Sequence, residues 1–143
     1  MFLGEYQHSL DAKGRVILPS KFRARLEGGC VLTKGQDSCL VVYPREAWDR
    51  LAQRLSEARL SSQQARNFNR LIFSGASDDG PDKQGRVSIP EQLRIYAHLE
   101  RDVAVIGAGA HVEIWDRAKW EEHRSRAERE YSEIAEADDN LPF

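Results

Sequence analysis

Two arginines in this sequence have neighbours that suit the binding of an anion. Arg15 and Arg86 each follow a glycine directly, and each lies four residues after an aspartate. A guanidinium group binds phosphate through two parallel hydrogen bonds and also pairs with the O6 and N7 acceptors of guanine. Lys13 and Lys83 stand near them, and lysine acts as a mobile positive charge. We therefore predict base reading by the arginines and phosphate contact by the lysines.

The aspartates and glycines of the same two segments suit a supporting task. Because phosphate repels a carboxylate, Asp11 and Asp82 are expected to position the loop, by accepting turn amides or by holding the arginine in one rotamer. Gly14 and Gly85 suit a backbone conformation that other residues resist. The simpler alternative is an exposed ion pair between aspartate and arginine, which contributes only about 0–1 kcal/mol. The added lysines favour the binding interpretation.

The two segments are copies of one unit. Residues 11–19 read DAKGRVILP and residues 82–90 read DKQGRVSIP, so that Asp, Gly, Arg, Val and Pro recur 71 positions later. At an offset of 72 further residues correspond: Gly35 with Gly107, Tyr43 with Trp115, Arg45 with Arg117, and Trp48 with Trp120. A repeat of this kind indicates a duplicated structural unit.

The repeat sets the predicted organisation of the 143-residue chain. We predict a first repeat with a helical extension in residues 1–75 and a second repeat with a C-terminal helix in residues 76–137. Residues 138–143 are expected to form a flexible acidic tail.

Each repeat must place its cations on an exposed turn. In the first copy, Tyr6, His8 and Leu10 alternate with polar or small residues, as in a half-buried strand. Asp11 to Gly14 then supplies turn residues, and a β-branched strand follows that stops at Pro19. The pattern predicts a β-hairpin whose tip carries the lysine and the arginine.

The remaining elements follow from hydrophobic spacing and helix caps. Further strands are predicted at residues 30–33, 39–43, 86–89, 103–106 and 111–115. Helices are predicted after Ser20, after Pro44, after Ser61 or Ser62, at residues 91–97, and after Asp116. The tryptophans and Phe68 lie on helical apolar stripes, so core packing is expected of them in place of base stacking.

The charge of the chain is unevenly distributed. The net charge is −2, which argues against a polybasic protein that coats nucleic acid indiscriminately. Residues 11–25 nevertheless hold five cations against one acid, a balance of +4, and residues 116–143 hold five cations against nine acids, a balance of −4. This asymmetry indicates an anionic partner for the basic repeat.

Several classes of protein and site lack support in the sequence. No stretch has the roughly 20 apolar residues of a membrane helix, and Glu5 interrupts a signal-like start, which favours a cytoplasmic protein. Cys30 and Cys39 are expected to be reduced thiols. The four histidines lack zinc spacing, and the common catalytic motifs are missing. We therefore expect no metal, no cofactor, no small-molecule substrate and no enzymatic activity.

These motifs occur together in an order that resembles the MraZ family. The segments concerned are Phe2-x-Gly4-Glu5-Tyr6, the two Asp-x-x-x-Arg-Val-x-x-Pro units, and Arg66-x-Phe68-x-Arg70 before Phe73-Ser-Gly-Ala76. The resemblance implies an α+β fold, a double-split (swapped-hairpin) β-barrel made of two internal repeats in one chain, with helices after each repeat. The resemblance also implies that this barrel is related to the AbrB/SpoVT DNA-binding domains.

The resemblance also implies a function. It implies a sequence-specific DNA-binding transcriptional regulator, associated with the nucleoid, that acts on the promoter of the division and cell-wall gene cluster, including its own gene. Short G-rich direct repeats in double-stranded DNA would be read by a ring-shaped homo-oligomer. The family's DNA-contacting loops carry over onto two sets of residues in this chain: Asp11, Lys13, Gly14 and Arg15, and Asp82, Lys83, Gly85 and Arg86.

Two other interpretations remain open at this level. An oligomeric interaction scaffold would bind acidic protein partners through the same basic loops. An enzyme that used the aspartate–arginine loops would need a deep pocket around Asp11 and Asp82.

Overall fold

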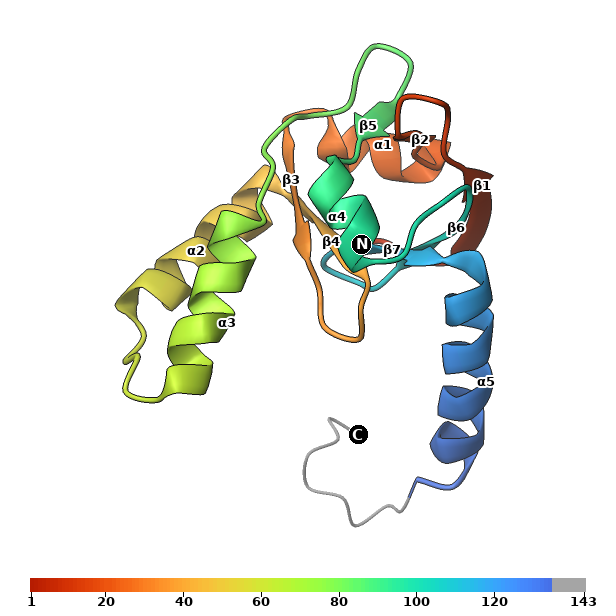
Figure 1. Cartoon of the computed structure of the whole chain (residues 1–143). Coiled ribbons are helices and arrows are strands. Elements are labelled where there is room, and N and C mark those ends of the chain that lie inside the picture. The colour runs from red at the N-terminus through yellow and green to blue at the C-terminus, as the bar shows by residue number, and fades with distance from the viewer. Residues whose placement is uncertain (135–143) are drawn as a thin grey trace.

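The computed structural model describes residues 1–134 and shows an α+β protein (Figure 1). The first half contributes β1 (Glu5–Ser9), β2 (Arg15–Ile17), α1 (Ser20–Leu26), β3 (Cys30–Lys34), β4 (Leu40–Pro44), α2 (Arg45–Glu57) and α3 (Gln63–Ser74). The second half contributes β5 (Arg86–Ser88), α4 (Glu91–Tyr96), β6 (Asp102–Gly107), β7 (Val112–Asp116) and α5 (Arg117–Ser132). The order strand, helix, strand, strand, helix therefore recurs, as the repeat predicts. The predicted tail, residues 138–143, lies outside the described residues.

The strands form two sheets, and both sheets take strands from both halves of the chain. Five antiparallel strands are arranged in the order β1-β6-β7-β4-β3. The two halves of the chain meet in this sheet at two places, where β1 pairs with β6 and where Leu40 in β4 faces Ile114 in β7. The short strands β2 and β5 form a separate antiparallel ribbon, in which Val16 faces Val87.

The predicted hairpin between residues 5–10 and residues 15–18 is wrong. β1 pairs with β6 and β2 pairs with β5, so the two strands that flank the first turn belong to different sheets. The turn residues reverse the chain, but a turn does not choose the partner of the strand that follows it. Burial makes that choice here, because Val16 and Val87 are both buried completely where the two copies of the repeat meet.

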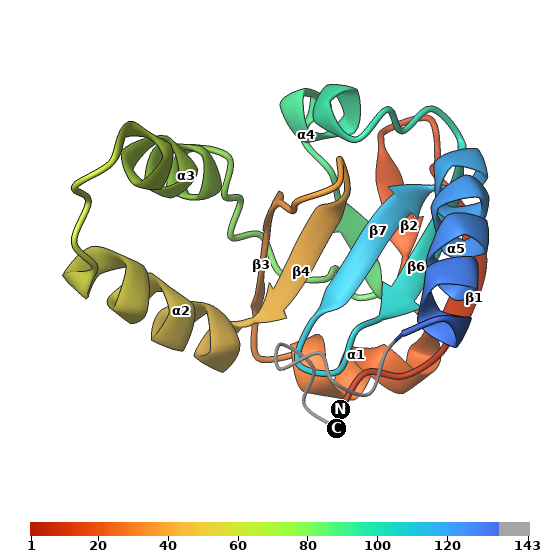
Figure 2. The same ribbon diagram turned by 90° about the horizontal axis from the view of Figure 1, so that it is seen from below.

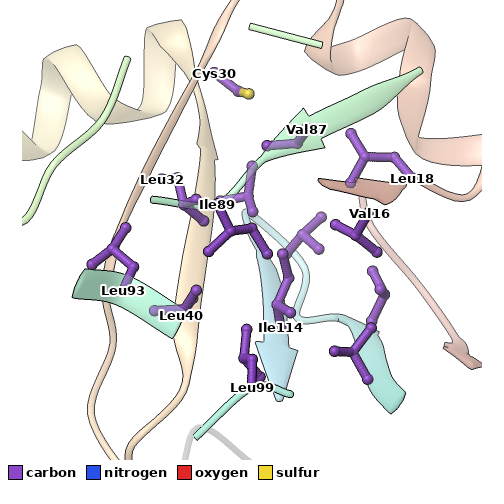
Figure 3. Close-up of a cluster of buried hydrophobic side chains, with 14 of the residues drawn as sticks. Val16, Leu18, Cys30, Leu32, Leu40, Val87, Ile89, Leu93, Leu99 and Ile114 are labelled. Atoms are coloured by element: carbon purple, nitrogen blue, oxygen red, sulfur yellow. The ribbon is translucent and has the colours of Figure 1, made fainter. Parts of the chain in front are cut away.

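The main core lies between the five-stranded sheet and the β2–β5 ribbon. Figure 3 shows side chains from the ribbon and from both halves of the sheet in one apolar cluster. Its labelled members are Val16, Leu18, Cys30, Leu32, Leu40, Val87, Ile89, Leu93, Leu99 and Ile114. Because the ribbon is anchored by its own buried side chains, the loops that lead into β2 and β5 have a rigid base.

Two helical pieces pack outside this core, one beside the β3 edge of the sheet and one over β6 and β7 (Figure 2). Helices α2 and α3 lie beside β3, where Trp48 and Ile72 are buried. Helix α5 lies over β6 and β7, where Trp115 packs on Trp120 with ring centroids 5.2 Å apart. Core packing of these tryptophans is confirmed. Among residues 1–134, no helix has the length and apolar character needed to cross a membrane.

The predicted helix caps are confirmed at two positions and wrong at a third. The side chains of Ser62 and Asp116 accept hydrogen bonds from backbone amides of the first turn, each at 3.0 Å. Ser20 is not a cap, because it is the first residue of α1 and Pro19 occupies the cap position. Proline has no amide hydrogen and a fixed φ angle, so it starts a helix without a side-chain cap.

Phe68 differs from its predicted place in the core. Its side chain is 44% exposed, and Leu71 on the same helix is 53% exposed. The apolar stripe of α3 packs on the sheet through Ile72, so only one edge of the stripe is covered. The sequence pattern correctly indicates an amphipathic helix, but the width of its apolar face exceeds what this chain buries.

Both cysteines are buried free thiols. Burial raises the pKa of Cys30 to about 11 and that of Cys39 to about 12. Neither side chain is therefore a reactive thiolate near neutral pH.

Candidate nucleic-acid interface

The first loop is organised around the carboxylate of Asp11. Its Oδ1 accepts hydrogen bonds from the backbone amides of Lys13 and Arg15, both at 2.9 Å. Its Oδ2 accepts the Nε–H of the Arg15 side chain at 2.7 Å. The Gly14 amide donates to the Asp11 carbonyl at 3.0 Å and completes the turn. One side chain thus fixes both the backbone of the loop and the orientation of its arginine.

The second loop repeats this geometry. Oδ1 of Asp82 accepts the amides of Gln84 and Arg86 at 2.9 Å each, and Oδ2 accepts Nε–H of Arg86 at 2.7 Å. The loops agree although their middle residues differ, because only the backbone amides of those residues are used. The position of the lysine is what changes: Lys13 corresponds to Gln84, and Lys83 corresponds to Ala12.

Each arginine keeps hydrogen-bonding capacity after it has paired with its aspartate. The guanidinium group has five N–H donors, and the aspartate takes only the one on Nε. Within residues 1–134, no hydrogen bond from an Nη atom of Arg15 or Arg86 is present. Their side chains are 25% and 26% exposed. The two Nη groups can therefore bind an acceptor pair such as phosphate or the O6 and N7 atoms of guanine.

The fold brings the two loops together at one end of the molecule (Figure 1). Arg15 faces Ser88 and Arg86 faces Ile17 in the β2–β5 ribbon, so the arginines stand at its two ends. They are two residue pairs apart, which corresponds to about 7 Å along the strands. A single chain therefore presents two related basic loops from one rigid base.

The comparisons with known proteins agree over the whole chain. The family model described as "MraZ protein, putative antitoxin-like" matches twice, at residues 1–71 and 72–141. The chain is 52% identical over 142 residues to the transcriptional regulator MraZ of Paenarthrobacter aurescens (strain TC1), covering 99% of this chain and 98% of the relative. The chain belongs to the MraZ family.

Two further members support this assignment. The transcriptional regulator MraZ of Kocuria rhizophila is 52% identical over 136 residues, and that of Heliobacterium modesticaldum is 48% identical over 136 residues. Each alignment covers 95% of both chains. The double match of the MraZ family model corresponds to the internal repeat that the sequence shows.

Two arginines of this MraZ family member contact the loops, and the motifs of the loops did not predict them. Arg23 in α1 lies against Gly85, and Arg94 in α4 lies against Gly14. Both glycines are buried although they lie in surface loops. The available signal was the repeat itself, because Arg23 and Arg94 are also 71 positions apart.

The aspartate carboxylates are poorly suited to acid–base catalysis. The side chains of Asp11 and Asp82 are 35% and 36% exposed, and each already accepts three hydrogen bonds. The Arg15 amide, followed by the guanidinium group and the Lys13 amide, lowers the pKa of Asp11 to about 2, and equivalent groups lower the pKa of Asp82. A carboxylate with so low a pKa is a weak general base at neutral pH.

We expect the Asp11 carboxyl group to titrate with a midpoint of about 2, below its ordinary value of 3.8. Because the folded pKa is the lower one, the contribution of this group to stability is complete above about pH 4 and is lost as the pH falls through 2. Carbon NMR of the side-chain carboxyl groups measures the midpoint.

Arg15→Ala is the matched control for this titration. It removes the side-chain donor but keeps the backbone amides, so the midpoint of Asp11 should rise only part of the way towards 3.8. A wild-type midpoint at or above 3.8 would contradict the hydrogen-bonded loop.

Proposed function

We propose that this protein is a sequence-specific DNA-binding transcriptional regulator. The observation that carries the proposal is the duplicated loop, in which an aspartate holds an arginine by Nε and leaves its Nη groups available. Relatives about 50% identical over nearly the whole chain are named transcriptional regulators. A fixed guanidinium group at the surface suits the edge of a guanine in the major groove, because its orientation entropy has already been lost.

Each residue of the loops has a part in this proposal. Arg15 and Arg86 read bases, and the exposed Lys13 and Lys83 contact phosphates. Asp11 and Asp82 position the arginines, and Gly14 and Gly85 allow the turn. The division into repeats at residues 1–75 and 76–137 remains part of the proposal, as does a double-split barrel as the description of the fold.

The target we propose is a set of short G-rich direct repeats in the promoter of the division and cell-wall gene cluster, including the gene of the regulator itself. This places the protein in the cytoplasm, associated with the nucleoid. A repeated target suits a protein that offers the same loop many times, because linked weak contacts multiply their effect. No enzymatic step is part of this function.

A homo-oligomer, in the form of a ring, is the second part of the proposal. It is supported by apolar side chains on α3 and α4 that the single chain leaves uncovered. Phe68 and Leu71 on α3 are 44% and 53% exposed, and Ile95 on α4 is 67% exposed. Large apolar side chains that are exposed to this extent suit contact with another subunit.

The decisive experiment compares binding of the full chain to two duplexes, one with G-rich direct repeats and one with the same bases shuffled. We expect tighter binding to the repeats, and a loss of affinity as salt increases. If the affinity for acidic proteins equals the affinity for both duplexes, the result would instead favour the interaction scaffold. Absence of binding to either duplex would refute the proposal.

We expect Lys13→Ala to weaken binding to both duplexes to a similar extent. Loss of one phosphate contact should lower the slope of log K against log salt by about 0.9 per engaged subunit. Lys119→Ala is the matched control, since this lysine is exposed on α5, away from the loops. A loss confined to the G-rich duplex would argue against a phosphate contact by Lys13.

A further inference from the structure

We propose that Arg23 and Arg94 are reciprocal positioning residues, each of which holds the DNA-reading loop that belongs to the other half of the chain. The inference rests on the proposed function for its consequence in DNA binding, but its structural part stands without DNA. It links α1 of the first half to the loop at Gly85, and α4 of the second half to the loop at Gly14.

Arg94 is linked to the first loop through the backbone of Ile89. Its Nη1–H donates to the carbonyl of Ile89 at 3.0 Å. The amide of Ile89 donates in turn to the carbonyl of Gly14 at 2.9 Å. Arg94 therefore braces the residue that holds the loop glycine, and its guanidinium group also covers that glycine directly.

The second loop has the equivalent contact with the halves exchanged, although a different nitrogen of the arginine donates. Nε–H of Arg23 donates to the carbonyl of Leu18 at 3.1 Å, and the amide of Leu18 donates to the carbonyl of Gly85 at 2.9 Å. The residues involved are all 71 positions from their counterparts, Arg23 from Arg94 and Leu18 from Ile89. The duplication has thus preserved a bracing contact that crosses between the halves.

The glycines explain why the arginines fit. Gly14 and Gly85 have φ angles of 75° and 77°, and neither has a side chain to fill the space above it. A methyl group at Gly14 would clash with the guanidinium group of Arg94, and one at Gly85 would lie 2.5 Å from Nε of Arg23. A flat guanidinium group fills this space and still reaches a carbonyl, whereas the ammonium group of lysine has no such plane.

A positioning role and a role in attracting phosphate predict different results when the arginine is replaced by lysine. If Arg23 and Arg94 merely attracted phosphate, a lysine in their place would keep most of the effect. If they position the loops, the lysine fails, and the damage appears in the loop of the other half. Arg94 therefore governs the loop of Arg15, and Arg23 governs the loop of Arg86.

The first test is amide hydrogen exchange on the full chain without DNA. In Arg94→Ala we expect the amides of Lys13 and Arg15 to exchange about fivefold faster, the change that corresponds to one lost hydrogen bond, while Gln84 and Arg86 stay unchanged. Arg23→Ala should show the reverse pattern. Faster exchange in the loop of the same half, or no change in either loop, would overturn the proposal.

The second test combines these changes with the loop arginines and measures affinity for the G-rich duplex. Because Arg94 acts through the first loop, Arg94→Ala should add little to Arg15→Ala but should keep its full effect, about fivefold, in Arg86→Ala. Arg23→Ala should behave in the opposite way. Equal and additive effects in both backgrounds would refute the crossed assignment.

Two controls complete the design. Arg94→Lys and Arg23→Lys keep the positive charge and the aliphatic stem, so they remain informative if an alanine variant fails to fold. If both lysine variants show wild-type amide exchange and wild-type affinity, charge alone acts and the positioning role is refuted.

Arg25→Ala is the control for loss of charge from α1. Arg25 packs over Phe2 and pairs with Glu46, so the amides of both loops should exchange in this variant as they do in the wild type. If the wild type binds no DNA, the proposed function fails, while the exchange pattern still decides the crossed contact.

Discussion

The double variant Arg15→Ala/Arg86→Ala should lose specific binding to the G-rich duplex. Each bidentate contact to a guanine is worth about 1–3 kcal/mol, and each engaged subunit would lose two of them. Thermal unfolding should change little, because ion pairs at the surface, such as those of these arginines with Asp11 and Asp82, contribute little to stability. A gel-shift titration and a melting curve on the same preparation measure the two quantities.

Single variants and a charge control distinguish base reading by the arginines from a general effect of positive charge. Arg15→Lys keeps the charge but loses the fork of donors, so its preference for the G-rich over the shuffled duplex should fall by about 1–3 kcal/mol, while Arg86 keeps its own contact. Arg50→Ala removes one positive charge from the exposed face of α2 and should leave specificity intact. Unchanged affinity in both Arg15→Ala and Arg86→Ala would refute base reading by these loops.

Phe22→Ala should produce the largest loss of stability, about 3–5 kcal/mol. Phe22 on α1 is 2% exposed and meets two other rings edge to face, with centroid distances of 5.2 Å to Phe2 and 5.4 Å to Tyr6. Its removal leaves a cavity between α1 and the N-terminal strand that rigid neighbours cannot close. Equilibrium unfolding in urea measures the change.

Tyr131→Ala is the matched aromatic control for this substitution. Tyr131 lies near the end of α5 and is 71% exposed, so its removal should change the free energy of unfolding by no more than about 0.5 kcal/mol. A loss below about 1 kcal/mol in Phe22→Ala would show that the cluster of three rings does not stabilise the fold.

The elements of this fold could be predicted from the sequence, but the partners of its strands could not. Two copies of an aspartate-to-proline unit indicate two turns and two short strands, and both turns and both strands are present. The prediction of a hairpin was wrong because the alternation of Tyr6, His8 and Leu10 specifies a strand with one buried face but does not specify which strand pairs with it. That neighbour, β6, begins at Asp102, and no local signal links the two segments.

For the candidate site too, the sequence predicts local geometry within each loop but not the contacts between the two halves of the chain. The geometry of Asp11 with Arg15 depends on residues four positions apart, so turn chemistry could anticipate it. The contacts of Arg23 and Arg94 depend on how one half packs on the other, and on their own both residues are only cations in short helices. Phe68 shows the converse, since its helical stripe indicates an apolar face without showing that the chain leaves part of it uncovered.

The pairing of β1 with β6 also affects how the chain can fold while it is being made. Glu5 bonds to the sheet opposite Ile106, so the first strand to leave the ribosome waits for about a hundred further residues before its neighbour exists. The reciprocal contact, a bridge between Leu32 and Ser77, also spans the two halves. Such distant contacts give the protein a high contact order, and the first half cannot complete its native structure until the second half has been synthesised.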